Sequence, residues 1–309
     1  MVEFIENWLD ENVAANGNHW LWQVAHFSLL IGMCHPNPIN LVAVYLLVTF
    51  PSDTWETLCS TMKTDTDEGV FFIFTKILPL FVFLLYWTNG GIYLLIENFF
   101  PSMVDPYRIQ QSKKIKPKKN KTDYLLKSIA MSTLVLVPGI AYLMYYTHTN
   151  VMPIRITPTL PTQRERLIDH FLSLMVNETI FFYGHWLFHA NKWLYKNVHK
   201  VHHEFTAPNA MSALHCHPVE LLLLDFIPLV GGAFFFNQHL SSLATFGAVA
   251  ILGTQTHHSG INWPWSLWDH QPEFHDEHHE RFDGNYGNIG FYDKLHGTEL
   301  KPKPVKKLK

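Results

Sequence analysis

Long apolar runs dominate the pattern of hydrophobic and polar positions along this chain. Several of them reach the roughly 20 residues that a helix needs to cross about 30 Å of hydrocarbon. The clearest are residues 77–96 and 125–146, whose lysines, Lys76 and Lys127, stand at the ends, where long side chains can reach the membrane surface. The full set comprises residues 21–34, 39–50, 70–96, 125–146, 167–183, 219–236 and 240–256. The pattern predicts a helical integral membrane protein.

The shorter apolar runs leave the number of spans open. Residues 219–236 and 240–256 are separated by only a few residues, so we expect a membrane hairpin whose halves are near the lower length limit for a span. Residues 21–34 and 39–50 are shorter still and form either a tight hairpin or a pair of helices at the membrane surface. We therefore predict an all-α integral membrane protein with about four to six transmembrane helices.

Charge predicts the orientation in the membrane. The linker 107–122 contains Arg108 and six lysines between two predicted spans. Because basic loops tend to stay in the cytosol, we expect this linker to be cytosolic. Counting spans onward, the histidine-rich residues 185–203 and the chain after the hairpin emerge on the same side. The final KKLK is either an endoplasmic reticulum retrieval signal or a basic tail near anionic lipid.

Net charge and cysteine content add little to this description. The formal net charge is −3, but the charges lie in separate blocks along the chain. We attribute the basic linker to membrane topology and expect no nucleic acid partner. The three cysteines lack CxxC spacing, so we interpret them as reduced thiols.

Histidine is the residue that points to chemistry. The chain has 20 histidines, and 14 of them lie between residues 185 and 279. Eight fall into three regular groups, HxxxH, HxxHH and a second HxxHH. On a helix, residues three or four positions apart share a face, so we expect each group to point its imidazoles in one direction, as a metal ion requires. The groups are His185 and His189; His199, His202 and His203; and His275, His278 and His279.

The spacing of the first two groups predicts a turn in the backbone. His189 and His199 are ten residues apart, which at 3.6 residues per turn leaves them about 80° out of alignment. A straight helix therefore cannot direct both groups at one centre. We expect either a bend near Ala190 and Asn191 or two separate helices.

The number of histidines indicates two metal ions. LHCHPVE adds His215 and His217, and TQTHHSG adds His257 and His258. Two of these nearby histidines would raise the total to as many as ten imidazoles, more than one tetrahedral zinc ion can use. Imidazole binds several transition metals, so the ligand type alone does not select one. The HExxH pattern of zinc hydrolases and the Glu and ExxH motifs of soluble di-iron bundles are both absent from the sequence.

These motifs, placed after membrane spans, resemble those of the fatty acid hydroxylase and sterol desaturase superfamily of integral-membrane di-iron oxidases. Within it, HKVHHEFTAP, HCHPVE, HHSG, EFHDEHH, NYG and LHGT are most similar to the methylsterol monooxygenases and the fatty acid hydroxylase domain-containing proteins. The resemblance runs from about residue 125 to 298. It implies N-terminal membrane segments and a basic cytosolic linker at 1–122, a di-iron domain at 123–298 and a basic tail at 299–309.

The resemblance also implies the metal ligands, and no catalytic side chain beyond the metal centre. His257 stands next to His258 where the family often has a single histidine, so either one could bind. Four acidic neighbours, Glu204, Glu220, Asp276 and Glu277, either hold imidazole N–H groups or are exposed carboxylates. The implied ligands are His185, His189, His199, His202, His203, His217, His258, His275, His278 and His279.

The activity implied by the resemblance is oxidation of a lipid by O2 at two iron ions, in the endoplasmic reticulum membrane with a histidine-rich helical cap facing the cytosol. The leading reaction is hydroxylation or oxidative demethylation of a sterol, of the C4-methylsterol oxidase type. Electrons would come from NAD(P)H through an external haem carrier of the cytochrome b type and its reductase, in keeping with the absence of a GxGxxG fingerprint.

Three alternatives remain at this point. The first is a hydroxylase or desaturase of fatty acids, sphingolipids or alkylglycerols from the same superfamily. The second is a relative that binds lipid without catalysis, although such a protein would be free to lose its histidines. The third is a metal transporter, which would need ionisable residues within its spans, whereas the grouped histidines follow the spans.

Overall fold

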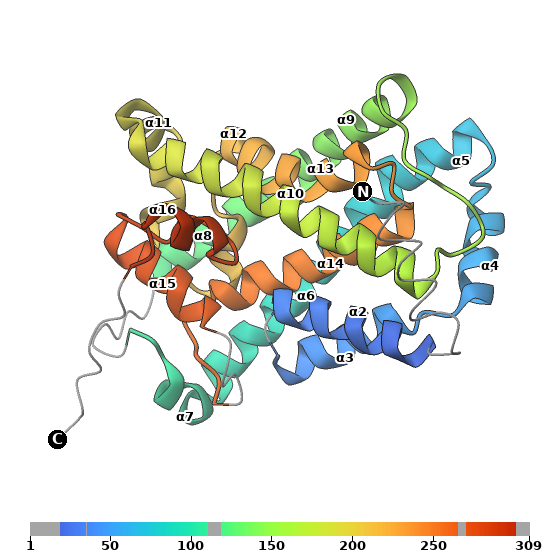
Figure 1. Cartoon of the computed structure of the whole chain (residues 1–309). Helices are drawn as coiled ribbons and strands as arrows, with labels where there is room; N and C mark the ends of the chain where they lie inside the picture. Colours follow the sequence, from blue (N-terminus) through green and yellow to red (C-terminus); the bar gives the residue numbers. More distant parts are fainter. Residues whose placement is uncertain (1–18, 35, 111–118, 265–269, 301–309) are drawn as a thin grey trace.

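The computed structural model describes residues 19–34, 36–110, 119–264 and 270–300 (Figure 1). The central part of the basic linker, residues 111–118, and the tail with its KKLK sequence lie outside the described residues. The described part is helical, and the only β-type pairing within it consists of two isolated bridges. The predicted all-α fold is confirmed.

The first half of the chain contributes two short apolar helices, a region of small helices and two long helices. Their elements are α2 (His19–Cys34), α3 (Pro38–Val48), α4 (Ser52–Met62), α5 (Asp67–Phe72), η2 (Ile73–Ile77), α6 (Leu78–Phe99), α7 (Pro101–Val104), η3 (Asp105–Tyr107), α8 (Lys119–Met131), η4 (Ser132–Leu136) and α9 (Val137–Asn150).

The second half contains the longest α-helix and most of the histidines. Its elements are α10 (Gln163–Ala190), α11 (Lys192–Asn197), η5 (His199–Glu204), η6 (Ala210–Leu214), α12 (Pro218–Glu220), η7 (Leu221–Phe226), α13 (Ile227–Phe235), α14 (Leu240–His257), α15 (Gln271–Arg281) and α16 (Phe291–His296).

Within the described residues, three continuous helices are long and apolar enough to cross a membrane. They cover Asp67–Phe99, Thr122–Asn150 and Pro218–Phe235, and so contain the predicted runs 77–96 and 125–146. Large apolar side chains such as Leu84 and Leu134 are exposed on them, as expected for surfaces that face lipid. The protein is therefore a membrane protein.

Each of these three helices contains a π-helical segment followed by proline. Pro79, Pro138 and Pro228 are each the second residue of the α-helix that follows η2, η4 and η7. A proline ring lacks an N–H and collides with the carbonyl four residues earlier, which in each case belongs to the π-helical segment. The wider π turn accommodates the ring, so the helix continues through the proline.

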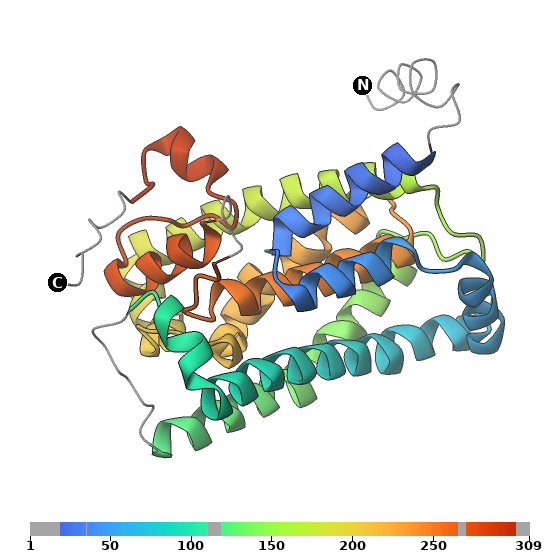
Figure 2. The ribbon, with the colours of Figure 1, turned by 90° about the horizontal axis from the view of Figure 1, so that it is seen from below.

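Helix α14 lies at the centre of the bundle, against α2, α6, α10 and α13 (Figures 1 and 2). Thirteen of its eighteen residues are buried, and most of its side chains are small or only weakly polar. It forms a helical hairpin with α13 as predicted, but its surface is covered by protein. Small residues on a helix surface allow neighbouring backbones to approach closely, which explains its central position.

The segments that carry the histidines gather at one end of this bundle. The end of α10, α11, α15 and α16 lie there, while α4 and α5 lie at the opposite end (Figure 1). The first residues of the basic linker join the same end: Ile109 donates its N–H to the Gly260 carbonyl at 3.0 Å, and Gln110 donates to the Asp276 carboxylate at 2.8 Å. The linker thus starts beside the histidines.

Candidate metal centre

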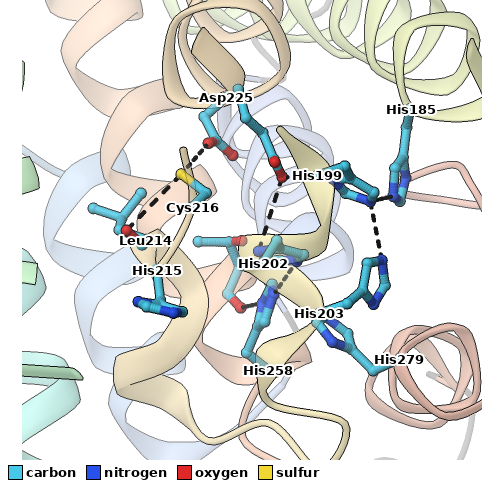
Figure 3. A network of polar contacts seen from close by, with 12 residues as sticks. His185, His199, His202, His203, Leu214, His215, Cys216, Asp225, His258 and His279 are labelled. Carbon is cyan, nitrogen blue, oxygen red and sulfur yellow. Dashed lines mark hydrogen bonds and ion pairs between the residues drawn. The ribbon is translucent and has the colours of Figure 1, made fainter. Parts of the chain in front are cut away.

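Nine of the ten predicted histidines come together in two adjacent groups. Within each group the ring nitrogens lie within 4.8 Å of one another. In Figure 3, His199 lies between His185 and His203, and His202 faces His258. We call the groups the first and second histidine clusters; the first contains His185, His189, His199, His203 and His278, and the second contains His202, His258, His275 and His279.

A turn after α10 brings the two N-terminal histidine groups together. Helix α10 ends at Ala190, and Asn191 adopts an extended conformation in which its side chain accepts the N–H groups that start α11. The chain then reverses, so that the Nε2 atoms of His189 and His199 lie 2.9 Å apart. The predicted turn at Ala190 and Asn191 is confirmed.

The short helix η5 supplies histidines to both clusters. It is a 3-10 helix, in which residues three apart are eclipsed and separated by about 6 Å along the axis. Accordingly, the rings of His199 and His202 are nearly parallel, with centroids 5.6 Å apart, and belong to different clusters. His203 joins His199 in the first cluster.

The helix α15 is also shared between the clusters. His275 and His279, four residues apart, enter the second cluster, whereas His278 enters the first. The expectation that each histidine group points its imidazoles in one direction is therefore wrong for both HxxHH motifs. Each motif instead connects the two clusters and holds them next to each other.

In four imidazoles, a hydrogen bond at Nδ1 determines which ring nitrogen carries the proton. A carbonyl or carboxylate oxygen can only accept, so Nδ1 carries the proton and the Nε2 lone pair points into the cluster. The pairs are His185 with the Tyr286 carbonyl at 2.7 Å, His278 with the Gly284 carbonyl at 2.8 Å, His258 with the Thr254 carbonyl at 2.7 Å and His199 with the Glu220 carboxylate at 2.8 Å.

This pattern fits a bound cation. The Nε2 atoms of His185 and His199 are 3.1 Å apart, and both carry lone pairs, so they repel unless a positive ion lies beside them. Two imidazole nitrogens bound at about 2.1 Å to one metal and at right angles would be about 3.0 Å apart. The donor set of both clusters is all nitrogen, which suits a transition metal better than magnesium or calcium.

Burial keeps the imidazoles neutral, as metal binding requires. It lowers the pKa of His202, His203, His275 and His279 well below the usual value, and the neighbouring histidines lower it further. The pKa of His278 falls to about 4, again because of burial. Protons therefore do not compete for these nitrogens near neutral pH.

A cavity of about 150 Å³ connects the clusters with the membrane part of the bundle. Histidines of both clusters line one part of it, including His199 and His202. Leu174, Leu229 and Phe246 from α10, α13 and α14 line another part. An apolar molecule in this cavity could bring a C–H group next to metals held by the histidines.

Comparison with known proteins agrees with this geometry. The model of the family described as fatty acid hydroxylase matches residues 170–298. Fatty acid hydroxylase domain-containing protein 2 of Homo sapiens is 30% identical over 254 residues, which cover 82% of this chain and 73% of the relative. The chain belongs to the fatty acid hydroxylase family.

Other relatives in this family carry different names. Methylsterol monooxygenase 2-2 of Arabidopsis thaliana is 34% identical over 173 residues, covering 53% of this chain and 64% of the relative. A very-long-chain aldehyde decarbonylase of Oryza sativa subsp. indica is 32% identical over 235 residues, covering 71% of this chain and 87% of the relative. No solved structure matches the chain.

Two histidines that the sequence offered as ligands, His217 and His257, are not part of either cluster. His217 is outside both clusters, and its Nδ1 accepts the Val219 N–H at 3.2 Å as the N-cap of α12. The structure places His258, and not His257, in the second cluster. His257 lines the cavity instead.

Of the acidic neighbours, Glu220 reaches a cluster histidine, because its carboxylate accepts from His199 at 2.8 Å. Glu204 instead accepts a hydrogen bond from His215 at 3.1 Å, and Asp276 accepts from Gln110. The sequence patterns did not distinguish these roles, because they depend on contacts between distant segments.

Two further acids that the sequence analysis missed hold the loop after α15. The buried carboxylate of Glu178 accepts the N–H groups of Asn288, Ile289 and Phe291 at 2.8, 3.0 and 3.2 Å. Asp293 accepts the N–H groups of Tyr286 and Gly287 at 2.8 and 2.7 Å. They fix the Tyr286 carbonyl that orients His185. The sequence gives a sign of Glu178, because it is a charged residue within the apolar run 167–183.

Proposed function

We propose that this protein is a membrane-bound di-iron oxidoreductase that uses O2 to hydroxylate or oxidatively demethylate a sterol, as a C4-methylsterol oxidase does. The observation that carries this proposal is the pair of adjacent, buried, all-histidine clusters opening onto one largely apolar cavity. Two iron ions held there would supply the activation of O2 and the oxidation of an unactivated C–H bond, which protein side chains cannot perform.

The chain's own residues prepare this site in three ways. The nine clustered histidines offer neutral nitrogens as ligands, and we retain them, without His217, as the proposed ligand set. Glu220 and the carbonyls of Tyr286 and Gly284 hold imidazole N–H groups, which fixes the direction of the lone pairs. The apolar cavity wall positions the lipid and limits access of water.

The family and its named relatives support two candidate classes of substrate. The similarity to methylsterol monooxygenase 2-2 of Arabidopsis thaliana supports a sterol as the substrate. The fatty acid hydroxylase family model supports the second candidate, a hydroxylase or desaturase of fatty acids, sphingolipids or alkylglycerols.

We also propose that electrons arrive from NAD(P)H through an external haem carrier of the cytochrome b type and its reductase. The proposed location is the endoplasmic reticulum membrane, with the clusters on the cytosolic side. The position of Ile109 and Gln110 supports this, because these first residues of the basic linker lie beside the clusters.

Anaerobic iron loading of the purified protein tests the metal centre. We expect two iron ions per chain, and we expect His202→Ala to abolish lipid turnover because that ring belongs to the second cluster. His270→Ala is the matched control, since His270 is exposed and outside both clusters. Fewer than one iron ion per chain, or full turnover by His202→Ala, would refute the proposal.

Lipid profiles of cells with and without the protein test the substrate. We expect a 4-methylated sterol to accumulate when the protein is absent. A change confined to sphingolipid or alkylglycerol chains would exclude the sterol and favour the second candidate.

A further inference from the structure

Asp225 is an ionisable residue near the middle of a membrane-crossing helix. It lies in η7, within the apolar helix Pro218–Phe235, and it lines the cavity shared with the histidine clusters. A carboxyl group in this position is costly unless a polar partner satisfies it, so such residues generally have a function. The proposed oxidation does not by itself account for it.

The protein satisfies this carboxyl group only in part. Among the described residues its only polar partner is the Cys216 thiol, whose sulfur lies 3.6 Å from Oδ2 (Figure 3). A thiol is a weak donor. The other oxygen, Oδ1, therefore has capacity for a hydrogen bond from a molecule in the cavity.

A second carboxylate in the same cavity has an unused oxygen. Glu220 is 4% exposed; its Oε1 binds His199, while its Oε2 has no hydrogen-bond partner among the described residues. It precedes Asp225 by five residues, and a π-helical turn brings residues at that spacing toward the same side. The cavity thus offers acceptors at two successive positions.

The charge of the cavity selects against anionic ligands. The described residues that line it include Asp225 and Glu220 but no lysine or arginine. A carboxylate or phosphate head would find no counter-charge there to offset its loss of hydration. A hydroxyl group, by contrast, can donate a hydrogen bond to Asp225, while Leu229 and Phe246 receive the hydrocarbon body.

We propose that Asp225 accepts a hydrogen bond from the hydroxyl group of a lipid alcohol and thereby selects and positions the substrate. This inference rests on the proposed function only in taking that lipid as the molecule oxidised. Asp225 lies about one π-helical turn from Glu220, so the hydroxyl end lies close to Glu220 and the clusters, and the apolar body extends away from them. The oxidised carbon is therefore near the hydroxyl group.

Equilibrium binding to the full-length protein in nanodiscs tests this inference without turnover. The probes are lanosterol and octadecanol, each paired with its methyl ether, together with stearic acid. We expect at least one alcohol to bind more tightly than its ether, and stearic acid to bind weakly. Asp225→Leu should weaken binding of that alcohol about tenfold to a hundredfold, as for loss of a hydrogen bond to a charged group, and leave the ether unchanged.

Two further variants complete this test. Asp225→Asn keeps a hydrogen-bond acceptor in a side chain of the same shape, so it should cause an intermediate loss of affinity for the alcohol. This variant tests the role of Asp225 if the leucine variant does not fold. Leu223→Met, on an exposed position of the same helix, should bind all probes as the unmodified protein does. Equal binding of alcohols and ethers by the unmodified protein, or an unchanged alcohol preference in both Asp225 variants, would overturn the inference.

The two proposals can fail separately. If alcohols bind through Asp225 but the iron-loaded protein oxidises no lipid, the proposed function is wrong and the inference stands. If lipids are oxidised with no dependence of binding on Asp225, the inference is wrong and the proposed function stands.

Discussion

At the scale of single residues, the position of one proton decides whether an imidazole can bind metal. His199 has its Nδ1 within 2.8 Å of the buried Glu220 carboxylate, so its Nε2 is left as the ligand atom. Hydrogen-bonded neighbours of this kind typically change metal affinity by 10–100-fold when they are removed. Glu220 is thus a positioning residue that acts through His199.

Replacing Glu220 tests this role. We expect Glu220→Ala to weaken iron binding by roughly 10–100-fold, because His199 loses the acceptor that orients it. Glu220→Gln should recover part of the affinity, since its amide oxygen can accept the same hydrogen bond. Iron content measured against a competing chelator gives the readout.

Glu204→Ala is the control for this comparison. Glu204 contacts His215, which is outside both clusters, so its loss should leave iron affinity unchanged. Equal iron loss in the Glu220 and Glu204 variants would show that the effect is general destabilisation and not ligand orientation.

At the scale of elements, the contact between α10 and α13 holds the first cluster in place. A Cβ atom added to Gly232 on α13 would lie 2.5 Å from the Ser173 Cα on α10, so the two backbones pack directly against each other. Helix α10 carries His185 and His189 near its end. The position of these two histidines therefore depends on a glycine far from them in the sequence.

Substitution of that glycine should loosen the bundle. We expect Gly232→Ala to lower the stability by about 1–3 kcal/mol, the usual cost of overpacking, and to lower iron content because α10 must shift. Thermal unfolding in detergent measures the first effect.

Gly247→Ala in α14 provides the matched control for helix propensity. A Cβ there would meet no atom within 4 Å, so we expect a neutral or slightly stabilising effect. A Gly232→Ala protein as stable as this control would contradict the proposed close packing.

At the scale of the whole molecule, the bundle has two distinct ends. One end carries the histidine clusters and the first residues of the basic linker, and the other carries α4 and α5 (Figure 1). Since the three longest apolar helices run between them, we expect the two ends to lie on opposite sides of a membrane.

Cysteine labelling in sealed endoplasmic reticulum vesicles tests that arrangement. The three native cysteines are buried, so background labelling should be low. We expect an impermeant maleimide to label Lys196→Cys in α11, and to label Asp53→Cys in α4 only after the vesicles are opened. Labelling of Asp53→Cys alone in sealed vesicles would reverse the proposed orientation.

Much of this protein follows from local sequence pattern. The apolar runs at 77–96 and 125–146 lie within two of the three longest apolar helices, because hydrophobicity over 20 residues is itself the requirement for a span. The ten-residue step from His189 to His199 predicted the turn at Ala190 and Asn191, because helical periodicity fixes the direction of each side chain.

Only the tertiary structure decided how the histidines divide between two clusters. His203 and His278 meet although they are 75 residues apart, and His202 meets His258 across 56 residues. The same long-range packing brought Glu220 to His199, left His217 outside both clusters and placed Asp225 in the cavity. Local periodicity fixes the face of an element on which a side chain lies, whereas its partner depends on which elements pack together.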